Sequence, residues 1–165
     1  MHDERSRRPG APYAIVLSTV SASRAFKVRL AVWERDQAVL KRIRLRVFVI
    51  EQGVPEALEW DGIDPDCRHA IAEDDKLQAI GCGRLLPDGH IGRMAVLRQW
   101  RGLGVGAALL QSLVALAREL GHERVLLNAQ VHALPFYRRH GFTAVGPPFM
   151  DAGIAHQSME RSILR

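Results

Sequence analysis

Apolar and polar side chains alternate along Phe26–Trp33, and this period of two predicts a first β-strand. The spacing of apolar residues then becomes helical, so we expect a helix over Asp36–Glu51. Apolar runs bounded by turn residues predict three more strands, over His69–Asp74, Leu77–Leu86 and His90–Leu97. The first half of the chain is therefore expected to hold a strand, a helix and three further strands.

The second half of the chain alternates between helical and strand patterns. An apolar stripe predicts a long helix over Gly104–Leu120, followed by a strand over Arg124–Ala129. A short helix is expected over His132–His140, and closing strands over Thr143–Val145 and His156–Ile163. This order predicts an α+β fold with α/β/α layers, in which a mixed sheet carries helices on both faces.

The chain has 165 residues, of which 47% are apolar and 25% charged, and these values indicate one globular domain. We assign that domain to residues 26–165 and expect residues 1–25 to form a flexible tail. Arg5–Arg8 and the apolar run Ala11–Val20 also resemble a secretory or twin-arginine signal, but the run is short and contains Pro12. No stretch reaches the ~18–20 apolar residues of a membrane span, so we expect no membrane partner.

Net charge and cysteine content narrow the function classes. The net charge of +5 is not gathered into a basic stripe, so we expect no nucleic-acid partner. The two cysteines, Cys67 and Cys82, give neither a disulfide framework nor the spacing of a metal site. We interpret both as packing residues and expect a cytoplasmic protein without a metal cofactor.

The sharpest chemical motif is the glycine-rich loop Arg101–Ala107, between a predicted strand and a long helix. Glycines allow the backbone to approach a ligand closely, and the N–H groups of a helix N-terminus favour phosphate. A plain glycine turn is one alternative. A dinucleotide fingerprint is another, because Gly102, Gly104 and Ala107 fit G-x-G-x-x-A. That motif expects an acidic residue at the end of the next strand, where this chain has Asn128-Ala129-Gln130.

Two segments together resemble the GCN5-related N-acetyltransferases (GNAT). Residues 96–106, VLRQWRGLGVG, look like the family's pyrophosphate motif R-x-x-G-x-G/A after a strand. Residues 133–142, ALPFYRRHGF, look like the later signature around its catalytic tyrosine. A narrower likeness to the ElaA-like and YjcF-like branch is carried by Arg44-x-x-Val47-Phe48-Val49-x-Glu51-Gln52, Glu59-x-Asp61-x-x-Asp64, His69 and Gly153-Ile154-x-His156-x-x-Met159. The resemblance covers residues 26–163.

The resemblance implies a GNAT fold: a central, mostly antiparallel sheet of six to seven strands, splayed between the fourth and fifth, with about four helices. It implies transfer of an acetyl group from acetyl-coenzyme A, as co-substrate, to a primary amine by direct attack in a ternary complex. A catalytically degenerate acyl-coenzyme A-binding or sensing module of the same fold is the alternative. Dimers are common among similar enzymes, which leaves a homodimer open.

The resemblance also assigns roles to residues. The loop would hold the cofactor's pyrophosphate through Arg101, Gly102, Leu103, Gly104, Val105, Gly106 and Ala107. The pantetheine arm would lie along Met94, Ala95, Val96 and Asn128, where a backbone N–H near Met94 or Ala95 would polarise the thioester carbonyl. Tyr137 matches the tyrosine that protonates the departing thiolate and contacts the cofactor.

The acceptor is a small-molecule or peptide amine whose identity the sequence does not name. Residues 51–66 carry six carboxylates and no Lys or Arg, which indicates either a solvated surface or a lip that attracts a cation. By resemblance, the acceptor site and the general base are sought among Glu51, Asp61, Asp64, His69 and His156. We interpret Glu51 as the catalytic base, while His69 and His156 each also fit a structural role.

Overall fold

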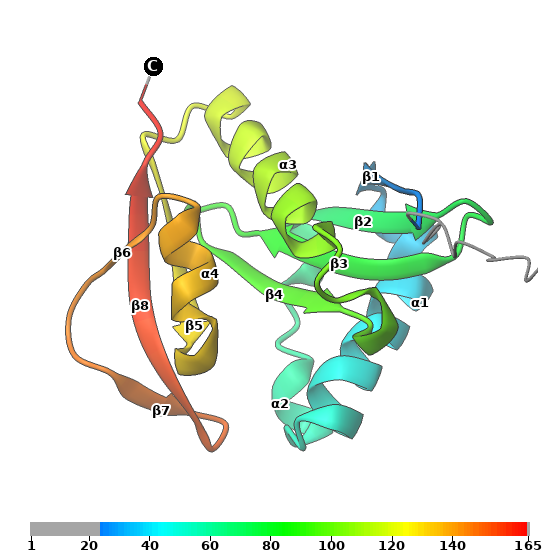
Figure 1. The fold of residues 1–165 in the computed structure, drawn as a ribbon, viewed down its shortest axis with the longest axis horizontal. Helices are drawn as coiled ribbons and strands as arrows, with labels where there is room; N and C mark the ends of the chain where they lie inside the picture. Colours follow the sequence, from blue (N-terminus) through cyan, green and yellow to red (C-terminus); the bar gives the residue numbers. More distant parts are fainter. Residues whose placement is uncertain (1–23, 165) are drawn as a thin grey trace, which may run out of the picture.

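The computed structural model describes residues 24–164, so the tail expected over residues 1–25 lies almost entirely outside them. Four antiparallel strands form the first sheet, in the order β1-β2-β3-β4 (Figure 1). Their bounds are Phe26–Ala31 for β1, Arg68–Asp74 for β2, Ala79–Leu85 for β3 and Ile91–Val96 for β4. All four strands lie where the hydrophobic pattern predicted them, with ends shifted by two residues or fewer.

The second sheet is built on β8 (Ile154–Ser162), which pairs antiparallel with β5 (Arg124–Gln130) on one side. On the other side it pairs with β6 (Thr143–Ala144) and β7 (Phe149–Asp151). The described residues therefore hold eight strands in two sheets, where six to seven were expected. The additional strand is β7, whose three residues are all exposed and so leave no alternating pattern to detect.

The two sheets meet at one end of β4 and β5 and separate toward the other end (Figure 1). At the joined end, His90 and Leu126 form an isolated parallel bridge, and the Leu126 N–H donates to the Gly89 carbonyl at 3.1 Å. Beyond this bridge β4 pairs only with β3, and β5 only with β8. This arrangement confirms the predicted splay between the fourth and fifth strands, and it exposes the facing edges of both.

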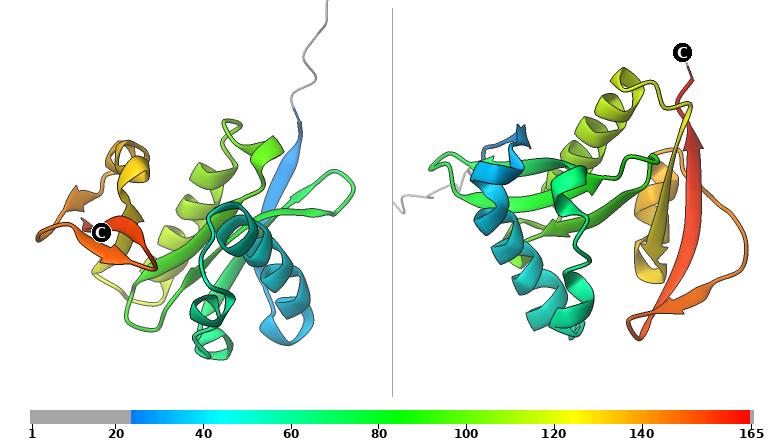
Figure 2. Two further views of the ribbon diagram at one scale, coloured as in Figure 1. Left: turned by 90° about the horizontal axis from the view of Figure 1, so that it is seen from below. Right: turned by 180° about the vertical axis from the view of Figure 1, so that it is seen from behind.

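Helices cover both faces of the first sheet (Figure 2). α3 (Val105–Glu119) packs on one face against β2, β3 and β4, and α1 (Trp33–Arg44) packs on the other. β2 is buried on both sides because its alternate residues enter two different cores. Ala70 and Ala72 join the core under α3, whereas Ile71 joins the core under α1. The expected α/β/α layering is confirmed.

The first helix begins earlier than expected and changes its hydrogen bonding near its end. Asp36 accepts a hydrogen bond from the Val32 N–H at 2.8 Å, which fixes the first turn and lets α1 begin at Trp33. From Leu45 to Glu51 the helix continues as a π-helix. The Gln52 N–H, for example, donates to the carbonyl of Val47, five residues earlier. Such wider turns are common at functional sites.

Two short helices complete the fold, α2 (Glu56–Glu59) and α4 (Leu134–Arg139). α2 lies in the segment that the sequence indicated as an acidic loop, and α4 packs beside β5. Three 3₁₀ turns link the elements, at Asp64–Asp66, Arg98–Trp100 and Val131–Ala133. Within residues 24–164, no helix has both the length and the apolar character to cross a membrane.

Candidate functional site

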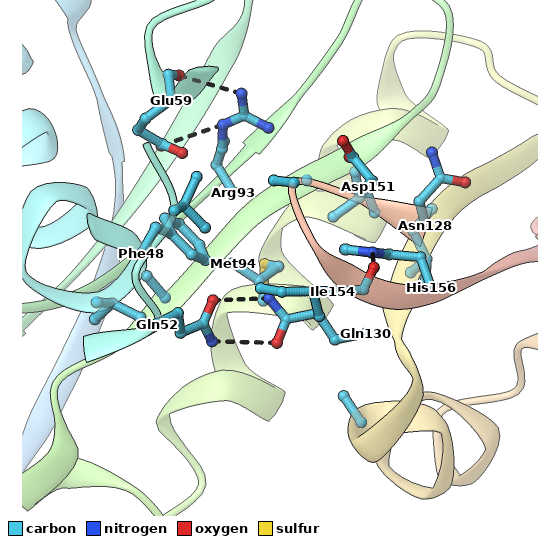
Figure 3. Close-up of a pocket in the computed structure, with 18 of the residues that line it drawn as sticks. Phe48, Gln52, Glu59, Arg93, Met94, Asn128, Gln130, Asp151, Ile154 and His156 are labelled. Atoms are coloured by element: carbon cyan, nitrogen blue, oxygen red, sulfur yellow. Dashed lines mark hydrogen bonds and ion pairs between the residues drawn. The ribbon is translucent and has the colours of Figure 1, made fainter. Parts of the chain in front are cut away.

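A cavity of about 620 Å³ lies where β4 and β5 separate (Figure 3). Its walls come from β4, β5, the π-helical turn, α2, α4 and the β7–β8 hairpin. Seven of the residues singled out in the sequence line it together: Met94, Ala95, Val96, Arg101, Asn128, Tyr137 and His156. The splayed strands thus gather residues that lie up to 62 positions apart in the chain (94 to 156).

The glycine loop lies beside this cavity and leads directly into α3. Gly102 and Gly104 adopt φ values of 74° and 86°, a left-handed conformation that only glycine takes without strain. Gly104 caps α3 and has no side chain to pair with the N–H groups of the first turn, which α-helical bonding also leaves free. A Cβ atom at either glycine would meet no heavy atom within 4 Å, so the loop presents open backbone suited to a phosphate.

Arg101 connects the loop to its surroundings on two sides. Its Nε donates to the Val96 carbonyl at 2.9 Å, and its Nη2 pairs with Glu51 Oε2 at 2.9 Å. Glu51 therefore reaches the glycine loop from the end of the π-helix, but it does not line the cavity. In this position Glu51 orients a cation of the loop, and the role of general base that the sequence suggested has no contact in the cavity to support it.

β4 forms the floor of the cavity and contains a β-bulge. Gly92 pairs with Arg84 and Ala95 with Cys82, so Arg93 and Met94 stand opposite the single residue between them on β3. Arg93 takes a left-handed φ of 49°, which is uncommon outside glycine and clusters at functional sites. A bulge leaves backbone groups outside the ladder of hydrogen bonds between the two strands.

Tyr137 lies on α4 and is 9% exposed. Its ring packs edge-on against Phe136 and Phe142, with ring centroids 5.0 Å and 5.9 Å away. Burial raises the pKa of the Tyr137 phenol to about 12, so the group is protonated at neutral pH. The side chain borders the cavity, so its proton is available to a group bound there.

The acidic segment does not form a free anionic lip. Three of its carboxylates, on Glu59, Asp61 and Asp64, pair with Arg44 of α1 and with Arg84 of β3. Arg44 donates to Glu59 Oε1 and to Asp64 Oδ1 at 2.7 Å each, and Arg84 Nη1 reaches the same Asp64 oxygen at 2.9 Å. We call these residues, together with Arg93, the ion-pair cluster. Arginines from other elements therefore neutralise these three carboxylates, which leaves less free negative charge for the cation-attracting lip that was one of the two alternatives.

Charges within the ion-pair cluster are unequally compensated. Burial opposes ionisation of Asp64, but its hydrogen bonds from Arg44 and Arg84 prevail and lower its pKa. Burial likewise opposes the charge on both of these arginines, and their carboxylate partners nevertheless raise the pKa of each. Arg93 differs, because burial lowers its pKa and the guanidinium groups of Arg84 and Arg44 lower it further by repulsion. The attraction of Glu59 and Asp61 does not offset these two effects.

Asp64 and His69 do not reach the cavity, and neither does Asp61. His69 is 2% exposed, stacks on Trp33 at 5.0 Å, and its Nε2 lies 2.9 Å from the Asp64 carbonyl. Burial lowers the pKa of His69, so the ring is neutral at physiological pH and donates Nε2–H to that carbonyl. His69 therefore fits the structural role left open in the sequence.

His156 enters the cavity from β8, opposite β4 (Figure 3). Its Nδ1 lies 2.7 Å from the Ile154 carbonyl, which can only accept, so Nδ1 carries the proton. Phe149 stacks on the ring at 5.8 Å and holds its plane. In the neutral imidazole this tautomer leaves the Nε2 lone pair free to accept a proton. Asp151, an exposed residue of β7, lines the same side.

Sequence reasoning missed the amide pair of Gln52 and Gln130, which bridges the two halves of the molecule. Gln52 Nε2 donates to Gln130 Oε1 at 3.1 Å, and Gln130 Nε2 donates back at 2.8 Å (Figure 3). It also missed Arg93 and Asp151. Gln52 ends a signature quoted in the sequence analysis, but no local signal predicts that these four residues lie near the cavity, because their proximity depends on the π-helical turn, the bulge in β4 and the position of β7.

The two cysteines are buried, and burial raises the pKa of the Cys82 thiol to about 12. A thiol with so high a pKa is a poor nucleophile at neutral pH. No group of three His, Cys, Asp or Glu side chains within residues 24–164 is arranged to hold a metal ion.

Comparisons with known proteins agree with this geometry. A family model described as "Acetyltransferase (GNAT) domain" matches residues 33–163. The uncharacterized N-acetyltransferase YjcF of Bacillus subtilis is 36% identical over 121 residues, covering 71% of this chain and 86% of the relative. An acyl-CoA N-acyltransferase from Pseudomonas aeruginosa is 30% identical with a TM-score of 0.74, over 84% of this chain and 100% of that one. Escherichia coli ElaA is 27% identical with a TM-score of 0.70, over 84% and 100%.

Proposed function

The chain belongs to the acetyltransferase (GNAT) family, and we propose that it transfers an acetyl group from acetyl-coenzyme A to a primary amine by direct attack. Membership of this family makes it an acyltransferase. The observation that carries the proposal is the open N-terminus of α3, with its left-handed glycines, beside a cavity that Tyr137 borders. These features suit the two ends of an acyl-coenzyme A, its pyrophosphate and its thioester.

Cofactor binding rests on backbone groups. N–H groups of the loop from Arg101 to Ala107 would hold the pyrophosphate, with the positive end of the α3 dipole behind them. Met94, Ala95 and Val96 on β4, with Asn128 on β5, would flank the pantetheine arm. A backbone N–H of the β4 bulge is suited to polarise the thioester carbonyl as charge develops on its oxygen.

Proton transfers accompany the exchange of bonds. The amine nitrogen forms a bond to the carbonyl carbon, and the carbon–sulfur bond breaks. Tyr137 would then give its phenolic proton to the departing thiolate. The proton lost by the acceptor's ammonium needs a base, and we propose His156 in place of Glu51. Its Nε2 lone pair lines the cavity, whereas Glu51 pairs with Arg101.

Replacing the proposed base should slow turnover while leaving cofactor binding intact. For His156→Gln we expect kcat to fall by about 10²–10⁴-fold, because general base catalysis contributes on that order. Added imidazole should restore part of the rate, a result that a merely structural histidine would not give. The matched control is His122→Gln, in the turn after α3 and away from the cavity. If His156→Gln turns over as fast as His122→Gln, a group other than His156 takes the proton from the acceptor's ammonium.

Cofactor binding itself tests the proposed function. We expect wild-type protein to bind acetyl-coenzyme A and desulfo-coenzyme A with Kd values of about 1–100 μM in isothermal titration. Gly104→Glu should abolish this binding, because it places a carboxylate against the phosphates and a side chain at a φ of 86°. Gly104→Ala introduces the same backbone strain without charge and should weaken binding less. Absence of wild-type binding at millimolar cofactor refutes the proposal.

The degenerate binding module is the second candidate, and turnover separates it from an enzyme. Both bind acyl-coenzyme A, but only the enzyme releases free thiol when amines are added. Thiol release with an amine panel supports the enzyme. Cofactor binding without thiol release from any amine supports the module.

A further inference from the structure

We propose that the acceptor amine also carries a carboxylate, and that Arg93, supported by Arg84, binds it within the cavity. This inference rests on the proposed function, because it identifies the substrate class of the same site. It differs from one of the two alternatives that the sequence left open, in which the acidic segment forms a lip that attracts a cation.

The ion-pair cluster presents charged groups to the cavity. Glu59, Arg84 and Arg93 of the ion-pair cluster line the cavity. The side chain of Glu59 is only 4% exposed, and Arg44 and Arg93 both lie against its Oε1. The side chain of Arg93 is 27% exposed. A molecule entering from the cavity therefore meets the guanidinium of Arg93 before it meets the carboxylate behind it.

Arg93 has a hydrogen-bond donor that its contacts with the protein leave unused. Nη2 of Arg93 donates to the Glu59 carbonyl at 3.1 Å and to Asp61 at 3.3 Å. Its Nη1 makes no hydrogen bond to any described residue, and in Figure 3 one guanidinium nitrogen points away from Glu59, toward the side where Asp151 lies. The Nε of Arg93 faces Glu59 Oε1 at 3.2 Å, and the Nε atoms of both Arg93 and Arg84 are buried without a well-aligned hydrogen bond within residues 24–164. Because these Nε atoms are buried, the donor that an anionic ligand in the cavity could use is Nη1 of Arg93.

The backbone holds Arg93 in an unusual conformation at the cavity wall. The residue stands in the bulge of β4 with a φ of 49°, so the fold holds a non-glycine residue in a strained conformation at the cavity wall. The lowered pKa of Arg93 agrees with a cation that lacks full compensation in the free protein. A ligand anion would supply the missing partner.

The size and surroundings of the site favour a carboxylate over a phosphate. Glu59 lies against Arg93, Asp61 lies at 3.3 Å, and Asp151 lies on the other side of the cavity. A phosphate dianion would suffer repulsion from all three, whereas a monoanion matches the exposed part of one guanidinium. Asp151 and His156 line the opposite side, where the amine of such a molecule would be received. An amino acid-like acceptor meets both requirements.

The test measures binding, so that it does not depend on turnover. Protein saturated with desulfo-coenzyme A is titrated with each common L-α-amino acid and with the α-amide of the same residue. We expect at least one acid to bind at least about tenfold more tightly than its amide, the difference that a charge-assisted bond gives. For that acid, Arg93→Gln should remove the preference while its amide binds as before. Arg124→Gln, which changes the same charge at a 64% exposed side chain, should retain it.

Other outcomes are distinguishable. Equal binding of acids and amides by wild-type protein, or a preference that survives in Arg93→Gln, overturns the carboxylate site. If O-phosphoethanolamine binds more tightly than every amino acid, the site beside Arg93 binds phosphate, and the proposal of a carboxylate site is overturned. Unchanged thermal stabilisation by desulfo-coenzyme A shows that the Arg93→Gln protein is folded. If an amino acid binds as expected but no thiol is released from acetyl-coenzyme A, the proposed transfer fails and the binding site stands.

Discussion

Tyr137→Phe should lower kcat by about 10²–10⁴-fold and leave the affinity for acetyl-coenzyme A within about twofold. The substitution removes only the hydroxyl, so the packing of the ring against Phe136 and Phe142 is retained. Burial raises the pKa of the Tyr137 phenol to about 12, and the same apolar surroundings disfavour a free thiolate. The neutral Tyr137 phenol therefore lowers the barrier to acetyl transfer by giving its proton to the sulfur of coenzyme A as the carbon–sulfur bond breaks.

Thiol release at saturating substrates measures this effect, and titration with desulfo-coenzyme A measures cofactor binding. The substitution keeps the ring contacts with Phe136 and Phe142, so the free energy of unfolding should change by less than about 1 kcal/mol. A loss of turnover without a loss of stability isolates the proton donor. Turnover equal to that of wild-type protein removes Tyr137 from the mechanism, although it leaves the fold and the family unaffected.

The ion-pair cluster should show the largest effect on stability. Arg44 is 1% exposed and makes three hydrogen bonds, to Glu59 and Asp64, so Arg44→Met leaves two buried carboxylates with fewer partners. Removal of one member of a buried ion pair costs about 3–5 kcal/mol, and we expect a loss of that size in urea unfolding. The cavity should also be disturbed, because Arg44 positions Glu59, and Glu59 positions Arg93.

Arg35→Met is the matched control for this prediction. Arg35 also pairs with a buried carboxylate, that of Asp36, but its own side chain is 66% exposed and Arg29 holds the same carboxylate. The control should lose less than about 1 kcal/mol. If Arg44→Met loses no more than Arg35→Met, the cluster does not stabilise the fold as described.

Local sequence features located most of the scaffold. The periods of two and 3.6 residues placed the first four strands and α3, because a strand or helix beside a core must repeat its apolar positions at its own geometric period. They did not reveal β7, whose residues are all exposed, or the change from α-helical to π-helical bonding at Leu45. Neither feature alters the local pattern of buried residues enough to be recognised.

The chemistry of the site divides in the same way. Gly102, Gly104 and the start of α3 form a left-handed glycine turn before a helix N-terminus, and because these residues are neighbours in the chain the sequence alone determined it. The charge of the acidic segment was different, because its partners come from distant strands and from α1. Arg84 lies 23 residues from Asp61, and Arg93 lies 34 residues from Glu59. Only the tertiary structure decided that these carboxylates are paired and that Arg93 lines the cavity beside them, since Coulomb interactions act through space and not along the chain.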